Sequence, residues 1–412
     1  MSKETKSPTI FYGWFVVAAC FAVTLSLGES FWAFGVFFKP LEDEFGWSRA
    51  LVSSGYTAFL LGYTISVVTA GRLADRYSSR PIILASALLS GLGISLCSQT
   101  QSINQLRFFL FIAGLGAGAS WSVPISVVQR WFYKEKRAGL ALSIVSAGVG
   151  VGALIFAPLI NYLILNYGWR NAYLTIGILF LIIIAVSSLV IKRSPTYARA
   201  GPESNGITLD SSNTEDWPTA KVVTTAPFFG LVLITCAGTL AFNIVSVHLV
   251  PHAVDVGISG TAAAAALGLM GGFSIPGRLV SGFISDRIGW KKVLAFSLFG
   301  MALSMICILL LKTQWTLYLF VFVFGICSGV RSPAQVGILS AFFGMRSVGE
   351  LIGITSGISQ LISAFAPYIA GFIFDTTGSY FIPFIIVMVF LFAASLFTTV
   401  ISKPLVKSRQ RG

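Results

Sequence analysis

Apolar stretches of about 20 residues recur along the whole chain, and they restrict its possible folds more than any other feature. At ~1.5 Å per residue, a helix of that length crosses the ~30 Å hydrocarbon core of a bilayer. The predicted spans are 13–38, 51–71, 81–99, 105–128, 138–164, 171–192, 226–249, 260–284, 292–311, 315–341, 348–374 and 380–402. Since 55% of the 412 residues are hydrophobic and 10% charged, a solvated globular surface is excluded. The sequence therefore predicts an all-α membrane protein with twelve transmembrane helices.

The basic residues are distributed unevenly between the two sides of the predicted membrane. If the N-terminus is cytoplasmic, 21 of the 28 Lys and Arg residues fall in cytoplasmic segments. The opposite side holds Lys39, Arg49, Arg107, Arg170 and Lys312. Cytoplasmic loops carry such an excess of positive charge, so we expect both termini in the cytoplasm and the spans in a plasma membrane, the inner membrane of a prokaryote. The same distribution explains the net charge of +13 without a nucleic-acid partner.

Two halves of the chain resemble each other on either side of a polar segment. Residues 194–222 are rich in Ser, Thr, Asn, Pro and Gly, and are predicted to be a cytoplasmic linker between an N-terminal bundle, 1–193, and a C-terminal bundle, 223–412. Three strings recur across it at offsets of 211, 209 and 210 residues, namely 71–76 with 282–287, 156–158 with 365–367, and Gly168 with Gly378. Near-equal offsets in the same order predict an ancestral six-helix repeat.

The first of these strings also carries a resemblance to a known family. Gly-Arg-Leu-Ala-Asp-Arg at 71–76 resembles the signature loop of the major facilitator superfamily. Within that superfamily, Tyr-Gly-Trp at 12–14 with 35–40, Arg-Ala-Gly-Leu-Ala at 137–141, and Asp-Thr-Thr-Gly-Ser-Tyr at 375–380 are similar to the monocarboxylate transporter and oxalate–formate antiporter branch. The resemblance covers nearly the whole chain.

The resemblance implies a fold and a mode of action. The fold is two six-helix, pseudo-symmetric bundles, which rock about a site near the middle of the membrane so that the site opens to each side in turn. In the superfamily the signature loop latches the cytoplasmic side while the cavity faces outward. Gating roles are therefore implied for Asp75, Arg76, Asp286 and Arg287.

Ionisable residues inside the spans are the main candidates for chemistry, because each is unfavourable in lipid and usually faces a bundle interior. Arg278 lies eight residues before Asp286, hence ~12 Å along a helix from the cytoplasmic turn. Its guanidinium presents paired donors that match a carboxylate. The branch carries a substrate-binding arginine at this place, and Arg278 matches it; the alternative is an arginine held by neighbouring carbonyls.

Three further residues have two possible roles each. Arg331, near the middle of its span, either contacts substrate or a gate or is held structurally by carbonyls of a helix broken by the flanking Gly and Pro. Glu29 is the one carboxylate well inside a span, and is either a proton carrier or the partner of a cavity arginine. His248 can exchange a proton or donate to a substrate, or can be an interfacial histidine without either role.

Several positions depart from the pattern of the branch. Animal monocarboxylate transporters carry an aspartate four residues before the span-eight arginine and a lysine in span one, whereas this chain has Ser274 and Trp32 there. The span-eleven lysine typical of oxalate carriers is also missing, since 348–374 contains no lysine and offers Ser359 and Gln360. A second cation for a dicarboxylate would be Arg331. These departures favour a monoanion, with Trp32 and Trp121 shaping an apolar cavity.

The expected function is therefore secondary active transport of a small monocarboxylate such as lactate, pyruvate or formate, with proton symport. An oxalate–formate type anion exchanger is the main alternative; a transporter of neutral or cationic solutes would leave Arg278 unexplained. A membrane enzyme is disfavoured, because no nucleophile constellation or metal-ligand cluster is recognisable. The expected partners are a carboxylate, protons and membrane lipid. No cofactor or metal is expected, and the protein is expected to act as a monomer.

Overall fold

The chain folds into helices throughout the part that the structure describes. The structure is a computed structural model that describes residues 12–32, 34–132, 137–192, 219–344 and 348–403. The helices are α1 (Gly13–Trp32), α2 (Phe34–Phe45), α3 (Arg49–Arg76), α4 (Ser79–Cys97), α5 (Ile103–Trp131), α6 (Ala138–Val190), α8 (Thr219–Val222), α9 (Ala226–Asp255), α10 (Gly260–Ile288), α11 (Trp290–Leu309), α12 (Gln314–Phe343), α13 (Val348–Ser363), α14 (Ala366–Thr377) and α15 (Phe381–Val400). No strand occurs in the described ranges.

The described helices form twelve membrane passes, although helices and passes do not correspond one to one. Eleven stretches of the described chain are long and apolar enough to cross a bilayer, and one of them, in α6, contains two passes. At Gly168 the backbone takes φ 81° and ψ 159°, a conformation that separates two helices and that glycine adopts readily. By contrast, α13 and α14 together make a single pass, and α2 is not among the stretches long and apolar enough to cross a bilayer by themselves. The predicted twelve-helix fold is confirmed.

Several helices run beyond the predicted spans. α3 begins at Arg49 after Ser48, whose side chain accepts a hydrogen bond from the N–H of Leu51. Ser102, Thr225, Ser259 and Thr313 cap α5, α9, α10 and α12 in the same way. Hydropathy identifies only the part of a helix that lies in the hydrocarbon core. The helix itself extends into the interface as far as a capping residue, whose side chain accepts a hydrogen bond from an N–H group that has no partner within the helix.

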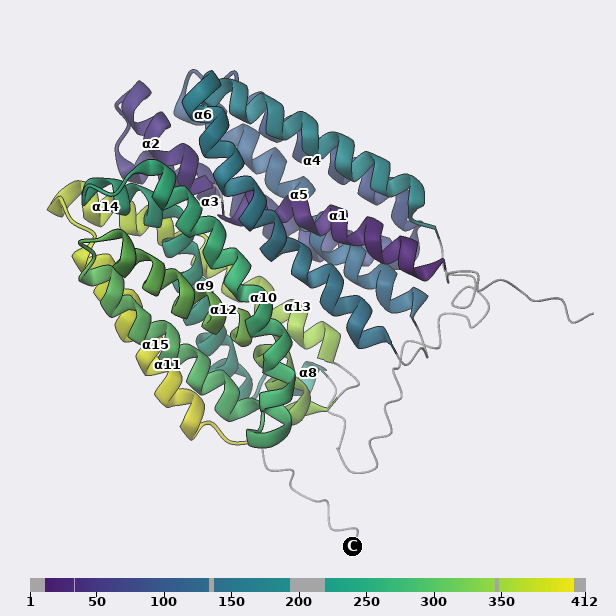
Figure 1. Ribbon diagram of the computed structural model, residues 1–412. Helices are drawn as coiled ribbons and strands as arrows, with labels where there is room; N and C mark the ends of the chain where they lie inside the picture. The colour runs from purple at the N-terminus through teal and green to yellow at the C-terminus, as the bar shows by residue number, and fades with distance from the viewer. Residues whose placement is uncertain (1–11, 33, 133–136, 193–218, 345–347, 404–412) are drawn as a thin grey trace, which may run out of the picture.

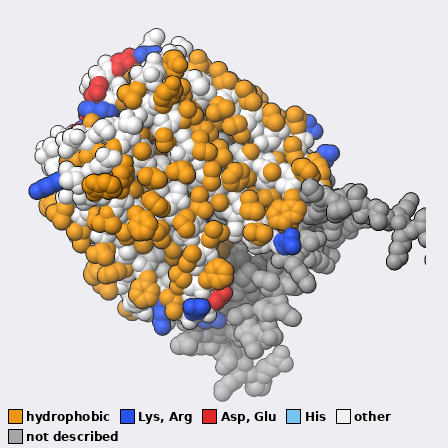
Figure 2. Space-filling view, in the orientation of Figure 1, with side chains coloured by type: hydrophobic (Ala, Val, Ile, Leu, Met, Phe, Trp, Pro, Cys, Tyr) orange, Lys and Arg blue, Asp and Glu red, His pale blue; other side chains and the backbone are white. Residues whose placement is uncertain are grey.

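The helices of the two chain halves lie on opposite sides of the molecule. Figure 1 shows α1 to α6, in purple to blue, on one side and α9 to α15, in green to yellow, on the other. Apolar side chains cover the middle of the face seen in Figure 2, and charged side chains gather toward its ends. We call the end where α1 begins and α15 ends the terminal face. The end where α2 ends and α3 begins is the opposite face. Of the expected linker 194–222, only α8 lies within the described residues.

The predicted repeat has a local structural counterpart at its glycines. Gly168 and Gly378 both adopt positive φ, 81° and 69°, and both end a helix at the opposite face. The proline strings differ, because Pro158 lies inside a continuous part of α6 while Pro367 follows the interruption between α13 and α14. Equivalent sequence strings therefore produce a continuous helix in one half and a broken one in the other.

Candidate functional site

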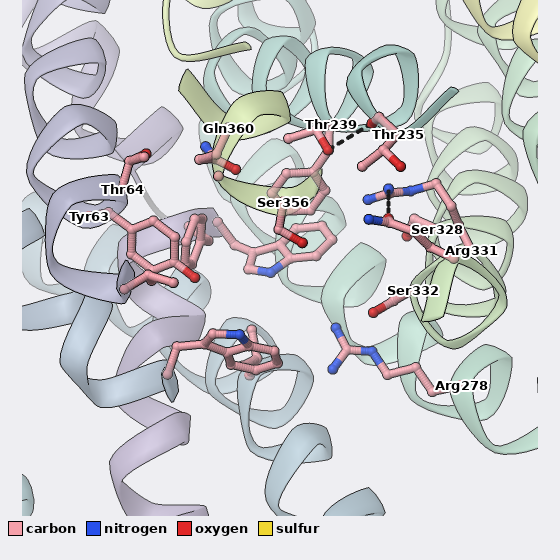
Figure 3. A pocket seen from close by; sticks show the side chains of 18 residues that line it. Tyr63, Thr64, Thr235, Thr239, Arg278, Ser328, Arg331, Ser332, Ser356 and Gln360 are labelled. Carbon is pink, nitrogen blue, oxygen red and sulfur yellow. Dashed lines mark hydrogen bonds between the residues drawn. The ribbon is translucent and has the colours of Figure 1, made fainter. Parts of the chain in front are cut away.

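A cavity of about 240 Å³ lies between the two groups of helices, near the middle of the passes (Figure 3). Its volume falls below the ~300–1,000 Å³ of pockets for drug-sized ligands, so it suits a small solute. Its wall is formed by aromatic, cationic and uncharged polar side chains. They include Phe31, Trp32, Tyr63, Trp121 and Phe242, the cations Arg278 and Arg331, and the polar residues Thr64, Thr235, Thr239, Ser328, Ser332, Gln335, Ser356 and Gln360.

The two arginines come from neighbouring helices of the C-terminal half, Arg278 from α10 and Arg331 from α12. Figure 3 shows both guanidinium groups directed into the cavity from the side opposite Tyr63 and Thr64. Their positive charges reinforce one another, and no acidic side chain is among the described residues that line the cavity. The potential in this space therefore favours an anion.

The hydrogen bonds of these arginines leave donors available. Nη1 of Arg278 donates to the carbonyl oxygen of Ser146 in α6 at 2.5 Å, a bond that crosses between the halves. Nη1 of Arg331 donates to Oε1 of Gln335 at 3.3 Å. In the described structure the buried Nε of each arginine has no hydrogen-bond partner. The described protein therefore satisfies these arginines only in part, and the guanidinium groups that Figure 3 shows directed into the cavity are where an acceptor can reach them.

A glycine makes room for the second arginine. A Cβ atom at Gly238 of α9 would lie 2.6 Å from Cδ of Arg331, closer than any real contact. Arg331 therefore packs its aliphatic stem against the backbone of α9 while its guanidinium reaches the cavity. The expectation that Arg331 faces a cavity or polar groups inside the bundle agrees with this placement.

The opposite wall is aromatic. Trp32 of α1 is buried and packs edge-on against Phe242 of α9 with ring centroids 4.7 Å apart. Phe31 contacts Tyr63 at 4.8 Å and Phe242 at 6.4 Å, again edge-on. These rings join the two halves on the side of the cavity toward the opposite face and give an anion's carbon chain an apolar surface.

The structure brings four predicted site residues together: Arg278, Arg331, Trp32 and Trp121 all line the cavity. Ser274 and His248 are not among its lining residues. Ser274 is buried one turn before Arg278, where its hydroxyl donates to the carbonyl oxygen of Gly271 at 2.6 Å. His248 is buried further along α9, where its ring nitrogens lie 2.9 Å from the Tyr380 hydroxyl and 2.9 Å from the Pro367 carbonyl oxygen.

The remaining predicted residues lie at or near helix ends. The side chains of Glu29, Asp75 and Arg76 lie outside the described residues, although their backbone belongs to α1 and α3. Asp286 and Arg287 are exposed in the last turn of α10 at the terminal face. Within the described chain no group of three His, Cys, Asp or Glu is placed to hold a metal ion.

Four uncharged polar residues of the cavity, Thr235, Thr239, Gln335 and Ser356, were missed from the sequence. They line the cavity in the pairs Thr235 with Thr239, Gln335 with the predicted Arg331, and Ser356 with Gln360. Each of these pairs is spaced by four residues within an apolar helix, so each places two polar groups on one helix face. This spacing is the signal that would have found them. Of the two residues noted in span eleven, Gln360 lines the cavity, while the buried hydroxyl of Ser359 lies 3.4 Å from the Val232 carbonyl oxygen.

Twelve passes around a central cavity between two halves define a membrane transporter. The sequence profile of the Major Facilitator Superfamily matches residues 16–313 and 232–411, and the chain therefore belongs to this superfamily. This result confirms the family predicted from the signature loop. It also identifies a multi-pass membrane transporter rather than an enzyme.

Relatives refine the placement within the superfamily. Monocarboxylate transporter 13 of Rattus norvegicus is 25% identical over 404 residues, covering 96% of this chain and 90% of the relative. Monocarboxylate transporter 12 of Homo sapiens is 25% identical over 419 residues, covering 93% and 79%. An uncharacterized MFS-type transporter of Bacillus subtilis (strain 168), YcxA, is 24% identical over 387 residues, covering 92% of both chains. The predicted relation to the monocarboxylate transporter branch is confirmed.

The fold is shared with a solved structure. A bacterial homologue of the human lysosomal transporter Spinster, in an inward-facing and occupied conformation, superposes with a TM-score of 0.75. The superposition covers 97% of this chain and 98% of that chain at 16% sequence identity. At that identity the likeness concerns the fold, which agrees with the predicted major facilitator fold.

Proposed function

We propose that this chain carries small monocarboxylates, such as lactate, pyruvate or formate, by alternating access and with proton symport. The observation that supports this most is the cavity itself, in which Arg278 and Arg331 face an aromatic wall within about 240 Å³. A carboxylate accepts paired hydrogen bonds from a guanidinium, and a short carbon chain packs against the aromatic rings. Arg278 is the main anion ligand in this proposal.

The proposal assigns the bundles and both faces of the membrane. The halves 1–193 and 223–412 are the rocking bodies, joined by the linker 194–222. The excess of basic residues at the terminal face makes that face cytoplasmic, so the opposite face is external, in a plasma membrane of prokaryotic type. A single chain contains a complete cavity, and the protein acts as a monomer. Asp75, Arg76, Asp286 and Arg287 gate the cytoplasmic side.

The proton is assigned to Glu29 or His248. Glu29 precedes the cavity-lining Phe31 and Trp32 by less than one helical turn of α1. Its place among the apolar residues of a predicted span is the reason for proposing that it carries a proton with the anion. His248 is the second choice, because it lies off the cavity wall. We expect Glu29→Gln to reduce uptake driven by a pH gradient while leaving exchange of substrate intact.

Anion exchange is the second candidate, and a specific observation favours it. Two guanidinium groups share one cavity without an acidic side chain among the described lining residues, which fits a dicarboxylate or an obligatory exchange of anions. An exchanger requires anion on the far side for flux, whereas a symporter accumulates substrate when only a proton gradient is imposed.

Uptake of labelled carboxylates by proteoliposomes tests both candidates. The panel contains lactate, pyruvate, formate and oxalate, each with and without an imposed pH gradient and with and without internal anion. Monocarboxylate accumulation driven by the pH gradient is the expected result. Flux that occurs only with internal anion identifies an exchanger, and absence of carboxylate flux under every condition overturns the proposal. Arg107→Ala, which removes an arginine at the opposite face outside the cavity, is the matched control for Arg278→Ala.

A further inference from the structure

The cavity has a polar side that the binding of a carboxylate by arginine leaves unused. Tyr63 and Thr64 of α3, in the N-terminal half, and Gln360 of α13, in the C-terminal half, line the cavity. Figure 3 shows these three residues on the side of the cavity away from Arg278. We call them the Tyr63 subsite. Because α3 and α13 pack against each other, both halves contribute to this subsite.

The cavity is larger than the smallest carboxylates require. A single water molecule needs about 10–15 Å³ of a cavity, whereas this cavity measures about 240 Å³. A formate or lactate whose carboxylate contacts Arg278 therefore leaves much of the space toward the Tyr63 subsite unfilled. A longer carboxylate places its far end among the polar side chains of the subsite.

Four hydroxyl groups of the cavity wall have only acceptor capacity left for a ligand. A Thr or Ser hydroxyl has one hydrogen to donate. The hydroxyl of Thr64 donates it to the carbonyl oxygen of Leu60 at 2.8 Å. The hydroxyls of Thr235, Thr239 and Ser328 likewise donate to carbonyl oxygens of their own helices. The oxygens of these four side chains can therefore only accept hydrogen bonds from a ligand.

The Tyr63 subsite also offers donors. The phenol of Tyr63 and the amide of Gln360 can each donate a hydrogen bond as well as accept one. Nε2 of Gln360 is buried without a hydrogen-bond partner in the described structure, and rotation of the amide exchanges its nitrogen and its oxygen. A ligand carbonyl can only accept from such a subsite, whereas a ligand hydroxyl both accepts and donates.

The charges around the cavity disfavour other polar groups at this position. An ammonium group is repelled by Arg278 and Arg331, and no acidic side chain is among the described residues that line the cavity. A second carboxylate at the Tyr63 subsite lacks a cation, because both guanidinium groups lie on the other side (Figure 3). An alkyl end displaces water from polar groups without replacing its hydrogen bonds. A neutral hydroxyl group meets all of these conditions.

We propose that the Tyr63 subsite is a specificity site for a hydroxyl group remote from the carboxylate, so that the preferred substrates are hydroxylated monocarboxylates longer than lactate. The carboxylate binds Arg278, while the hydroxyl donates to Thr64 and accepts from Tyr63 or Gln360. The carbon atoms between them pack against the aromatic wall. This inference rests on the proposed function, since it takes Arg278 as the ligand of the carboxylate.

Carboxylates of one chain length test the proposal without any change to the protein. The set is hexanoate, 2-hydroxyhexanoate, 5-hydroxyhexanoate and 5-oxohexanoate, and isothermal titration calorimetry of the purified protein measures their dissociation constants. We expect 5-hydroxyhexanoate to bind about tenfold more tightly than hexanoate, because its hydroxyl pairs with donors and acceptors of the subsite. The affinity of 5-oxohexanoate should lie between these two. The hydroxyl of 2-hydroxyhexanoate stays beside the arginines, so this acid should bind less tightly than 5-hydroxyhexanoate.

Substitutions in the subsite should remove this preference. Thr64→Val keeps the shape of the side chain without its oxygen, and Gln360→Leu replaces the amide by an apolar group of similar size. Each should bring the dissociation constants of 5-hydroxyhexanoate and hexanoate within about threefold of each other. Thr69→Val is the matched control. Thr69 lies on the same helix and its hydroxyl also donates one turn back, to the Ile65 carbonyl oxygen at 2.9 Å, but it is exposed outside the cavity. This variant should keep the tenfold preference.

Equal dissociation constants for hexanoate and 5-hydroxyhexanoate in the unmodified protein overturn the proposal, whether or not the variants fold. An equal gain from the hydroxyl of 2-hydroxyhexanoate also overturns it, as does a preference that survives in folded Thr64→Val and Gln360→Leu proteins. Flux of lactate without binding of any hexanoate overturns this proposal alone. These results leave the carboxylate proposal standing. Absence of both binding and carboxylate flux in the proteoliposomes overturns the two together.

Discussion

Arginine is enclosed at two places in this molecule, and its partners differ. The guanidinium of Arg49 gives its donors to carboxylates of the protein, one of them on the other half. Arg278 and Arg331 have only a carbonyl and an amide oxygen as described partners, and each keeps an unpaired Nε. An arginine that is paired with carboxylates of the protein stabilises the contact between its helices. A charge left without an acidic partner is available to a ligand.

The largest expected effect is at Arg278. Arg278→Ala should abolish carboxylate binding and transport while the protein still inserts and folds, because α10 packs against α6 over much of its length and the bond to Ser146 is a small part of that contact. Arg278→Lys keeps the charge but loses the paired geometry, and should weaken binding by about 1–3 kcal/mol. Ligand-induced thermal stabilisation of purified protein measures both variants.

Arg107→Ala should retain stabilisation by carboxylates like that of the unmodified protein. If Arg278→Ala is stabilised equally well, the anion site lies elsewhere and Arg331 becomes the leading ligand.

Substitution of Arg49 should have the opposite effects, namely a loss of stability and an intact response to carboxylate. Arg49→Gln leaves Asp255 without its paired donors and should destabilise the contact between the two halves by about 1.5–3 kcal/mol, the range for hydrogen bonds to charged groups. Ligand-induced stabilisation should survive, because Arg49 does not line the cavity. Melting temperatures with and without carboxylate separate the two effects. Loss of ligand response in a folded Arg49→Gln protein would contradict the separation of the cavity arginines from the ion-paired Arg49.

Arg331 tests which anion the cavity prefers. If the substrate is a monocarboxylate bound mainly by Arg278, Arg331→Gln should weaken its binding by about tenfold, equivalent to about 1.4 kcal/mol. A dicarboxylate such as oxalate should lose much more, since it needs both cations. Titrations of lactate and oxalate against this variant measure the difference. Arg107→Ala, at the opposite face outside the cavity, is the control and should bind both anions normally.

The smallest effect is expected for an exposed ion pair. Glu44 accepts hydrogen bonds from the indole of Trp169 and from Arg170, and these bonds lower the pKa of its carboxyl group. Its stabilising contribution is therefore present above the usual glutamate pKa, ~4.3, and is lost as the pH falls through the lowered value. Glu44→Gln should slightly flatten the loss of melting temperature in acid. A loss of melting temperature as large as that expected for Arg49→Gln would contradict the expectation that the exposed ion pair contributes less stability than the buried one.

Much of the fold follows from local pattern alone. The length and spacing of the apolar stretches predict twelve passes, because the bilayer demands about 20 apolar residues for each. Recurring strings predict the relation of Gly168 to Gly378, and both have the positive φ that favours glycine. The depth of Arg278 and Arg331 along their helices predicts that both face the interior of the protein, since a charged side chain that faces lipid is highly unfavourable.

Tertiary structure decided which residues meet. From the sequence, Arg49 was one of five basic residues on the outer side, and nothing local pairs it with Asp255, 206 residues later. The position of His248 in the sequence indicates its depth in the membrane but not the direction of its side chain. The packing of α9 against Tyr380 and Pro367 decides that direction. Periodicity along one helix defines a face, whereas the neighbour of that face is set by how all the helices pack together. The cavity and the ion pair between Arg49 and Asp255 are both products of that packing.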